Sequence, residues 1–145
     1  MARLIERFTA ALRADAPAAP VGTLVGFRPT LIEHGKAVFE LDAGPQHANP
    51  MGTLHGGIIC DVADAAMGTA YASTLGEEES FTTLELKINF LRPFWSGTLV
   101  ATGRVVKGGR TIGLVECDVT DAEGRLVARA MSTCMTLRGD LSEGR

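Results

Sequence analysis

The sequence is poor in aromatic residues, in cysteine and in long apolar runs. Aromatic side chains make up 6% of its 145 residues, which disfavours the base-stacking surfaces that bind single-stranded nucleic acids. Basic residues are not in excess, since 14 Lys and Arg stand against 17 Asp and Glu, giving a formal net charge of −3. Binding to phosphate backbones needs clustered cations, so we expect no nucleic-acid partner. No apolar run approaches the roughly 18 residues of a membrane-spanning helix, so we expect no membrane partner.

The three cysteines, Cys60, Cys117 and Cys134, are odd in number, and no two have CxxC spacing. A disulfide framework or a zinc site is therefore not expected, and we predict no metal site. Each cysteine stands in an apolar context, which is typical of buried free thiols in a reducing compartment. The first residues also lack the apolar core of a signal peptide. These features together predict a cytoplasmic protein.

The sequence does contain enough apolar residues to form one hydrophobic core. Its composition is that of a globular chain, and its length fits one domain. Helical spacing of apolar residues appears over residues 4–13 and over 57–73, the second being rich in small residues and expected to be buried. The element order predicts an α+β fold, with a curved antiparallel sheet wrapped around one long central helix. Alternation predicts the strands at 22–30, 36–42, 81–91, 98–107, 111–120 and 126–137.

Chemistry is indicated by the segment from Asn49 to Gly57, which leads into the second helix. The first turn of a helix has unpaired N–H groups and a partial positive charge. Because Gly56 has no side chain, a substrate oxygen could approach that backbone as in an oxyanion hole. Asp64 follows two turns later among small apolar residues, where a carboxylate is costly unless it is paired or used. The alternatives are an ordinary glycine at a helix start and a structural carboxylate.

The spacing of these two residues limits how they can act together. Gly56 and Asp64 are eight residues apart, which is about 12 Å along one helix axis. A reacting carbonyl lies about 3 Å from both its oxyanion donor and its nucleophile. If both residues serve one reaction centre, they come from different subunits with antiparallel helices. The sequence therefore predicts a homo-oligomer, at least a dimer.

One spaced pattern resembles the signature of hotdog-fold acyl-CoA thioesterases: Asn49-x-x-Gly52-x-x-His55-Gly56-Gly57-x6-Asp64. It is most similar to the phenylacetate-degradation (PaaI-like) branch of the 4-hydroxybenzoyl-CoA thioesterase superfamily. The resemblance implies hydrolysis of acyl-CoA to a carboxylic acid and free CoA, without a cofactor, by dimers that pair into tetramers. We expect the chain to divide into an N-terminal helix and Ala/Pro-rich connection at 1–20, the hotdog domain at 21–138 and a C-terminal tail at 139–145.

The resemblance also implies catalytic roles for single residues. The Gly56 N–H would bind the thioester oxygen, and His55 would support the carbonyl and orient the preceding loop. Asn49 would position the thioester or the attacking water, which Thr83 would hold. Asp64 would be the nucleophile or the general base, two roles that the sequence leaves open.

Substrate binding follows from the charge of CoA. A weakly acidic protein needs a local cationic patch to bind the phosphates of CoA, and the resemblance places the nucleotide along a rim of strand ends and turns. Candidates for the cations are Arg92, Lys107 and Arg110, and candidates to pack the pantetheine arm are Phe90 and the Gly109 backbone. For a medium-chain or aryl acyl group, we expect an apolar pocket lined by Met51, Leu54, Met67 and Tyr71.

Two other functions use the same fold. A non-catalytic acyl-CoA-binding or sensing protein would not need the complete set of Asn49, His55, Gly56 and Asp64. A dehydratase needs a histidine paired with an acid across a different loop, and the sequence has no such motif. The sequence therefore favours the thioesterase.

Overall fold

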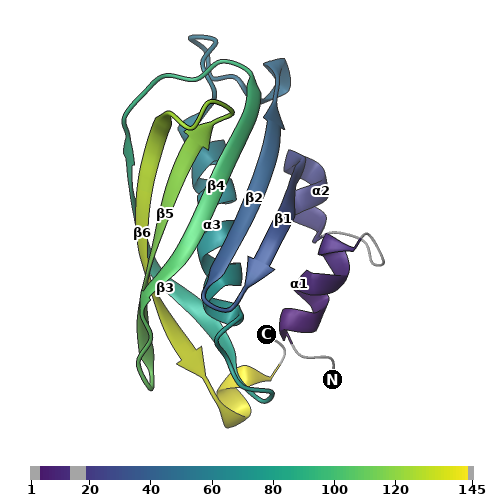
Figure 1. Ribbon diagram of the computed structural model, residues 1–145, viewed down its shortest axis with the longest axis vertical. Coiled ribbons are helices and arrows are strands. Elements are labelled where there is room, and N and C mark those ends of the chain that lie inside the picture. The colour runs from purple at the N-terminus through teal and green to yellow at the C-terminus, as the bar shows by residue number, and fades with distance from the viewer. Residues whose placement is uncertain (1–3, 14–18, 144–145) are drawn as a thin grey trace.

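The computed structural model describes residues 4–13 and 19–143. One long helix lies across one face of a six-stranded antiparallel sheet, which confirms the predicted α+β arrangement (Figure 1). The elements in chain order are α1 (Leu4–Leu12), α2 (Pro20–Val25), β1 (Phe27–Glu33), β2 (Lys36–Ala43), the 3-10 turn η1 (Pro45–His47), α3 (Gly56–Ala72), β3 (Ser80–Phe90), β4 (Gly97–Lys107), β5 (Ile112–Asp121), β6 (Leu126–Leu137) and the 3-10 turn η2 (Gly139–Ser142).

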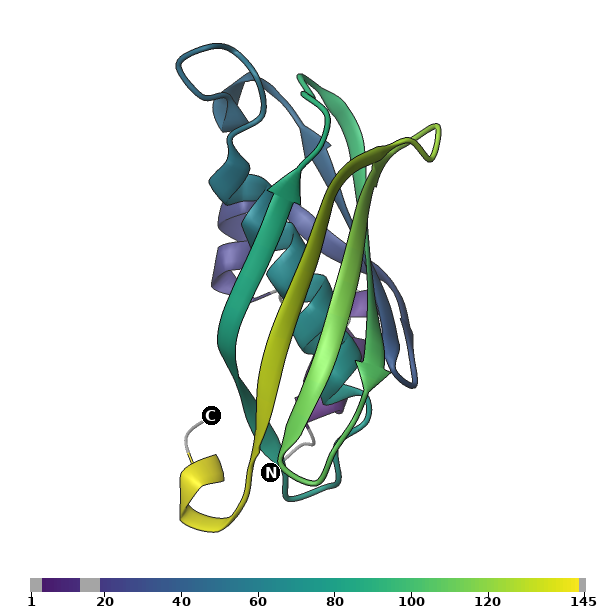
Figure 2. The ribbon, with the colours of Figure 1, turned by 90° about the vertical axis from the view of Figure 1, so that its left-hand side faces the viewer.

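The strands do not follow one another across the sheet in chain order. Their order is β1-β2-β4-β5-β6-β3, so β3 pairs with β6 and forms one edge. The connection over residues 91–96 therefore runs from that edge to the middle of the sheet and passes the β5–β6 turn, with which it lines a shared cleft. Figure 2 shows β3 at the edge with α3 behind it. The strand that follows the helix thus stays beside it.

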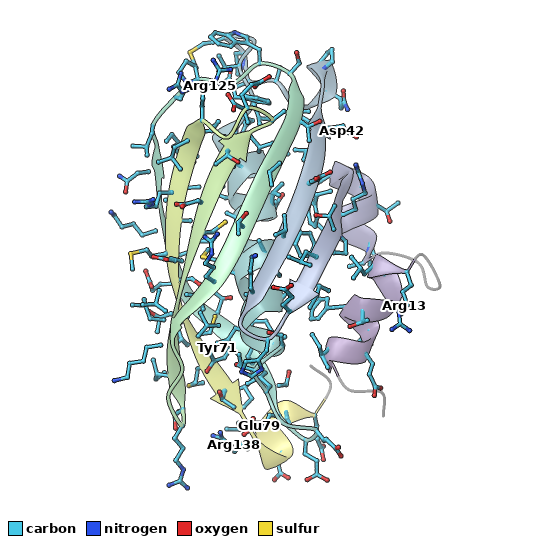
Figure 3. The ribbon with its side chains drawn as sticks, in the orientation of Figure 1. Arg13, Asp42, Tyr71, Glu79, Arg125 and Arg138 are labelled. Carbon is cyan, nitrogen blue, oxygen red and sulfur yellow. The ribbon has the colours of Figure 1, made fainter. Side chains whose placement is uncertain are left out.

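The core lies between α3 and the concave face of the sheet. Ala63, Ala66 and Ala70 of α3 are fully buried, so the small residues of the helix let it approach its own sheet closely. The helix backbone comes close to Gly103 of β4, where a Cβ atom would lie 2.5 Å from the Ala66 carbonyl oxygen. At the far end of α3, Tyr71 is buried, and its hydroxyl is hydrogen-bonded to Thr136; Figure 3 labels Tyr71. The opposite face of α3 is open over residues 56–65, where Gly57, Asp61 and Asp64 are exposed, whereas residues 66–72 are all buried.

The predicted strand over residues 22–30 is wrong in its first half. Pro20 occupies the first turn of α2, where its fixed φ suits a helix and its missing N–H costs nothing. Gly26 ends α2 in the left-handed conformation, with φ of 96°, and its N–H donates to the Gly22 carbonyl oxygen. The strand begins only at Phe27. The weak alternation before that residue therefore had no structural meaning.

The division of the chain into three parts stays a prediction. The first helix, α1, agrees with the expected helix over 4–13, whereas most of the Ala/Pro-rich connection lies outside the described residues. The predicted tail over 139–145 begins as η2, and its last two residues also lie outside. Within the described ranges, no helix is long and apolar enough to cross a membrane.

Candidate active site

The start of α3 is fixed by His55. Its Nδ1 accepts a hydrogen bond from the Gly57 N–H at 2.9 Å, so His55 caps the helix and carries its ring proton on Nε2. Its own N–H donates to the carbonyl oxygen of His47 at 2.9 Å. Among the described residues, no acceptor is bonded to the Gly56 N–H, as is usual at the first position of a helix. A backbone donor is thus available at the predicted place.

The ring of Phe90, at the end of β3, lies directly over Gly56. A Cβ atom on Gly56 would come within 2.8 Å of the Phe90 Cζ atom. The structure therefore brings together two residues to which the sequence assigned different roles, the oxyanion donor and a pantetheine contact. It also adds a second reason for glycine at this position, because a side chain would displace the ring.

Asn49 is bonded within its own loop. Its Oδ1 accepts from the Met51 and Thr53 N–H groups at 2.9 and 3.2 Å, and its Nδ2 donates to the Thr53 hydroxyl at 2.8 Å. The loop is joined to the connection after β3 by the Leu54 N–H, which donates to the Phe94 carbonyl oxygen at 2.7 Å. Asn49 is therefore a loop-forming residue in this structure, and its contact with the thioester or water stays a prediction.

These residues share one cleft. Asn49, Gly56, Phe90 and Arg92 line a space of about 410 Å³ where the loop before α3 meets the end of β3. A free backbone N–H, an aromatic ring and a solvent-exposed guanidinium lie around it. The cleft therefore offers the chemistry needed to bind an oxyanion and an anionic carrier arm.

The middle of α3 carries a second group. Asp61 and Asp64 lie on the exposed face of α3, and the Thr83 hydroxyl of β3 donates to Asp64 Oδ1 at 3.4 Å. Although Asp64 reaches solvent, nearby protein atoms displace enough water to raise the pKa of its carboxyl above the ordinary value. The Thr83 hydrogen bond lowers that pKa, and the charge of Asp61 raises it. An accessible carboxyl with a raised pKa is a candidate for acid–base or nucleophilic chemistry.

Asp64 and Thr83 open on a separate cavity of about 290 Å³. None of the residues that the structure describes lines both this cavity and the cleft that contains Gly56. The described part of one chain therefore keeps the oxyanion donor and the carboxylate apart, as their spacing along the helix requires.

The residues expected to line the acyl pocket do not come together in one cavity of the described chain, and their role stays a prediction. Met67 and Tyr71 are buried in the core, Leu54 is buried and lines the cleft with Gly56, and Met51 is 82% exposed on its loop. Apolar spacing on a helix does not distinguish core from pocket, because both need the same side chains. The cavity beside Asp64 is instead lined largely by α1, α2 and the first strands, which no sequence pattern linked to Asp64.

The predicted cations do not form one rim within a chain. Arg92 lies just after the C-terminal end of β3. The β4–β5 turn, with Lys107, Gly109 and Arg110, lies at the opposite end of the sheet, where β3 begins. The length of β3, Ser80–Phe90, separates the two ends by about 30 Å.

Arg138 lies at the end of the sheet where β3 begins and is already paired with a carboxylate. Its guanidinium forms an ion pair with Glu79 at 2.6 Å, and Figure 3 shows the two side chains together there.

The chain is similar to known thioesterases. A family model described as the thioesterase superfamily matches residues 51–128. A Saccharolobus solfataricus protein, provisionally named an esterase, is 38% identical over 74% of this chain and 76% of its own. Human acyl-coenzyme A thioesterase 13 is 30% identical over 68% of this chain and 71% of its own. A solved structure from Ralstonia eutropha, described as phenylacetic acid degradation-related, is 30% identical, covers 89% of this chain and 98% of its own, and gives a TM-score of 0.80.

Proposed function

The chain belongs to the thioesterase superfamily, in its PaaI-like hotdog branch, and from that membership we propose that it hydrolyses acyl-CoA thioesters to a free carboxylic acid and CoA. Membership in the family supports thioester hydrolysis. That CoA carries the acyl group, and which residues act in the reaction, are our proposal. The observation that carries it is Asp64, an accessible carboxyl with a raised pKa, bonded by Thr83 at the mouth of an apolar cavity.

Each complete site is assembled from two subunits. Asp64 and Thr83 of one chain would face Gly56 of the partner subunit across two antiparallel copies of α3, because one chain holds these groups in separate clefts. The open face of α3 leaves room for such a pairing, and β3 is an edge strand with unpaired backbone groups and an exposed Leu84.

The same pairing accounts for the separated cations. When two subunits pair with their α3 helices antiparallel, the end of the sheet with Arg92 in one subunit lies beside the β4–β5 turn of the partner subunit. The cationic rim for CoA would then combine Arg92 of one subunit with Lys107 and Arg110 of the partner subunit. Phe90 and the Gly109 backbone would flank the pantetheine arm.

Pairing of dimers into a tetramer is supported by the outer face of the sheet. Val106, Ile112, Leu114 and Met131 are exposed there on three neighbouring strands. Exposed apolar patches of this kind mark protein contacts. Sedimentation or light scattering of the purified protein would give the number of subunits.

In the chemical step, the Gly56 N–H stabilises the charge that develops on the thioester oxygen. The Asp64 carboxylate either attacks the thioester carbon, releasing the CoA thiolate and leaving a mixed anhydride that water opens, or removes a proton from water that attacks the same carbon. Single-turnover hydrolysis in ¹⁸O-water tests the first route, since label in the Asp64 carboxyl requires the anhydride. Neither route uses a metal or redox cofactor, so a chelator should leave the rate unchanged.

We place the enzyme in the cytoplasm, which its unpaired cysteines support.

A mixing experiment tests the shared site. Asp64→Asn and Gly56→Pro are each expected to keep about 1% of wild-type activity or less. Co-expression of the two chains should restore about a quarter of wild-type activity, because half of the dimers then hold one intact site of two. Release of free thiol from a panel of acyl-CoAs is the measurement. No recovery in mixed dimers would place both groups in one subunit. Binding of acyl-CoA by the wild type without thiol release would instead identify a sensing protein.

A further inference from the structure

The cavity beside Asp64 is closed by the N-terminal part of the chain. Phe8 and Ala11 of α1 line it, together with residues at the start of α2. In Figure 1, α1 lies beside β1 at the edge of the sheet, and it also contacts α3. The first helix, α1, therefore lines the same cavity as Asp64 of α3.

The lining of this cavity is apolar apart from a few groups near α3. Four phenylalanine rings, Phe8, Phe27, Phe39 and Phe81, come from α1, β1, β2 and β3. Among the described residues that line it, the charged ones are Asp61 and Asp64, and both are acidic. An anionic group would lose water there and meet like charge, so the cavity suits an uncharged group.

The size of the cavity also limits its occupant. Its volume of about 290 Å³ lies at the lower end of the roughly 300–1,000 Å³ of ligand pockets. The cavity therefore fits a compact acyl group, aromatic or of medium length, better than a long fatty chain. Ala11 is the smallest side chain that α1 contributes, so its methyl group leaves space that a larger residue would fill.

We propose that this cavity receives the acyl group of the substrate, and that Phe8 and Ala11 of α1 form its end wall and so determine which acyl groups are hydrolysed. The proposal rests on the proposed function, which places the thioester carbon beside Asp64. From that point the CoA arm leaves toward the cleft with Gly56 of the partner subunit. The acyl group must then extend the other way, past Thr83 and Phe81 toward α1.

The test compares Ala11→Leu and Phe8→Ala with Arg7→Leu, which adds a leucine at an exposed position of the same helix. The measurement is kcat/KM for straight-chain acyl-CoAs from acetyl to palmitoyl. Ala11→Leu should lower kcat/KM increasingly with chain length, by about tenfold or more for the longest good substrate, since a methylene in an apolar pocket changes rates about 10–200-fold. Phe8→Ala should move the preference to longer chains, and Arg7→Leu should keep the wild-type profile.

A second arm tests the charge of the cavity. Hexanoyl-CoA and adipyl-CoA have acyl chains of equal length, but adipyl ends in a carboxylate. The wild type should prefer hexanoyl-CoA by about 100-fold or more, and Asp61→Asn should narrow that ratio because it removes one of the two negative groups. An unchanged ratio in Asp61→Asn would remove Asp61 from the explanation of substrate choice.

The failures of the two proposals are distinguishable. If the wild type hydrolyses no acyl-CoA, the proposed function is wrong. If it does so and both Ala11→Leu and Phe8→Ala keep the wild-type chain-length profile, α1 is not the end wall. Thermal melting identifies a variant that fails to fold, and in that case Ala11→Val, with a smaller added volume, gives the same comparison.

Discussion

The start and the middle of α3 are two turns apart on one helix, yet they are built in different ways. The start is a backbone site: the Gly56 N–H is aimed by the His55 cap and by a loop that Asn49 holds together. The middle is a side-chain site, where Asp64 depends on its surroundings for its pKa and on Thr83 for its orientation.

The difference shows where each half is vulnerable. A backbone donor survives most substitutions at its own position and is lost only when the N–H itself is removed or the loop moves. A carboxylate is lost by changing one atom. Because the two halves meet only between subunits in our proposal, changes in either half should abolish the same activity by different routes.

The largest effect is expected for Asp64→Asn. This change removes the nucleophile or base and keeps the shape of the side chain, so kcat should fall by about 10²–10⁴-fold. Folding should not suffer, because a raised pKa means that the folded chain disfavours the ionised carboxyl. At pH 7 the melting temperature should therefore equal or exceed that of the wild type.

Asp61→Asn, three residues earlier on the same helix face, is the matched control. On an acyl-CoA whose acyl group is uncharged, such as hexanoyl-CoA, this variant should lose less than tenfold in kcat. Equal losses in the two variants would show that general acidity of the cavity, and not the Asp64 carboxylate, supports the reaction.

The next effect separates the donor from the space at Gly56. Gly56→Pro removes the N–H but suits the helix, because proline is tolerated at the first helical position and His55 before it has φ −63° and ψ 133°. Gly56→Ala keeps the N–H. Both substitutions add a Cβ atom that displaces Phe90.

We expect Gly56→Pro to lower kcat by about 10²–10³-fold, the usual cost of one oxyanion donor, and Gly56→Ala to lower it much less. Circular dichroism should show equal helix content in both. If the two variants lose activity equally, the contact with Phe90 matters and the N–H does not.

The elements of the fold could be predicted from local patterns, but their arrangement could not. Alternation located the strands from β2 to β6 and small-residue helical spacing located α3, because both periods are local. The pairing of β3 with β6, about fifty residues later, depends on tertiary packing that no local pattern records. The short helix α2 was missed although Pro20 and Gly26 mark its ends.

The site shows the same limit. The spacing of Gly56 and Asp64 along one helix predicted two separate halves, and the structure places them in separate clefts. The wall of the cavity could not be predicted, since Phe8 and Phe39 come together with Asp64 only in the folded chain. Asp61 could have been found, because residues three apart on a helix share a face.

The smallest effect is a shift in pH dependence that should appear in the middle of α3 and not at its start. Both roles of Asp64 need the ionised carboxylate, so kcat/KM should rise with pH through a pKa above the ordinary aspartate value. Thr83→Val removes the hydrogen bond that favours the charged form and should move this acidic limb to higher pH. Asp61→Asn removes a like charge and should move it to lower pH. Gly56→Ala should lower the rate and leave the limb in place, since the Gly56 backbone does not titrate. The same limb in wild type, Thr83→Val and Asp61→Asn would mean that another group controls the acidic side of the profile, and the contrast between the two halves of α3 would then lose its electrostatic basis.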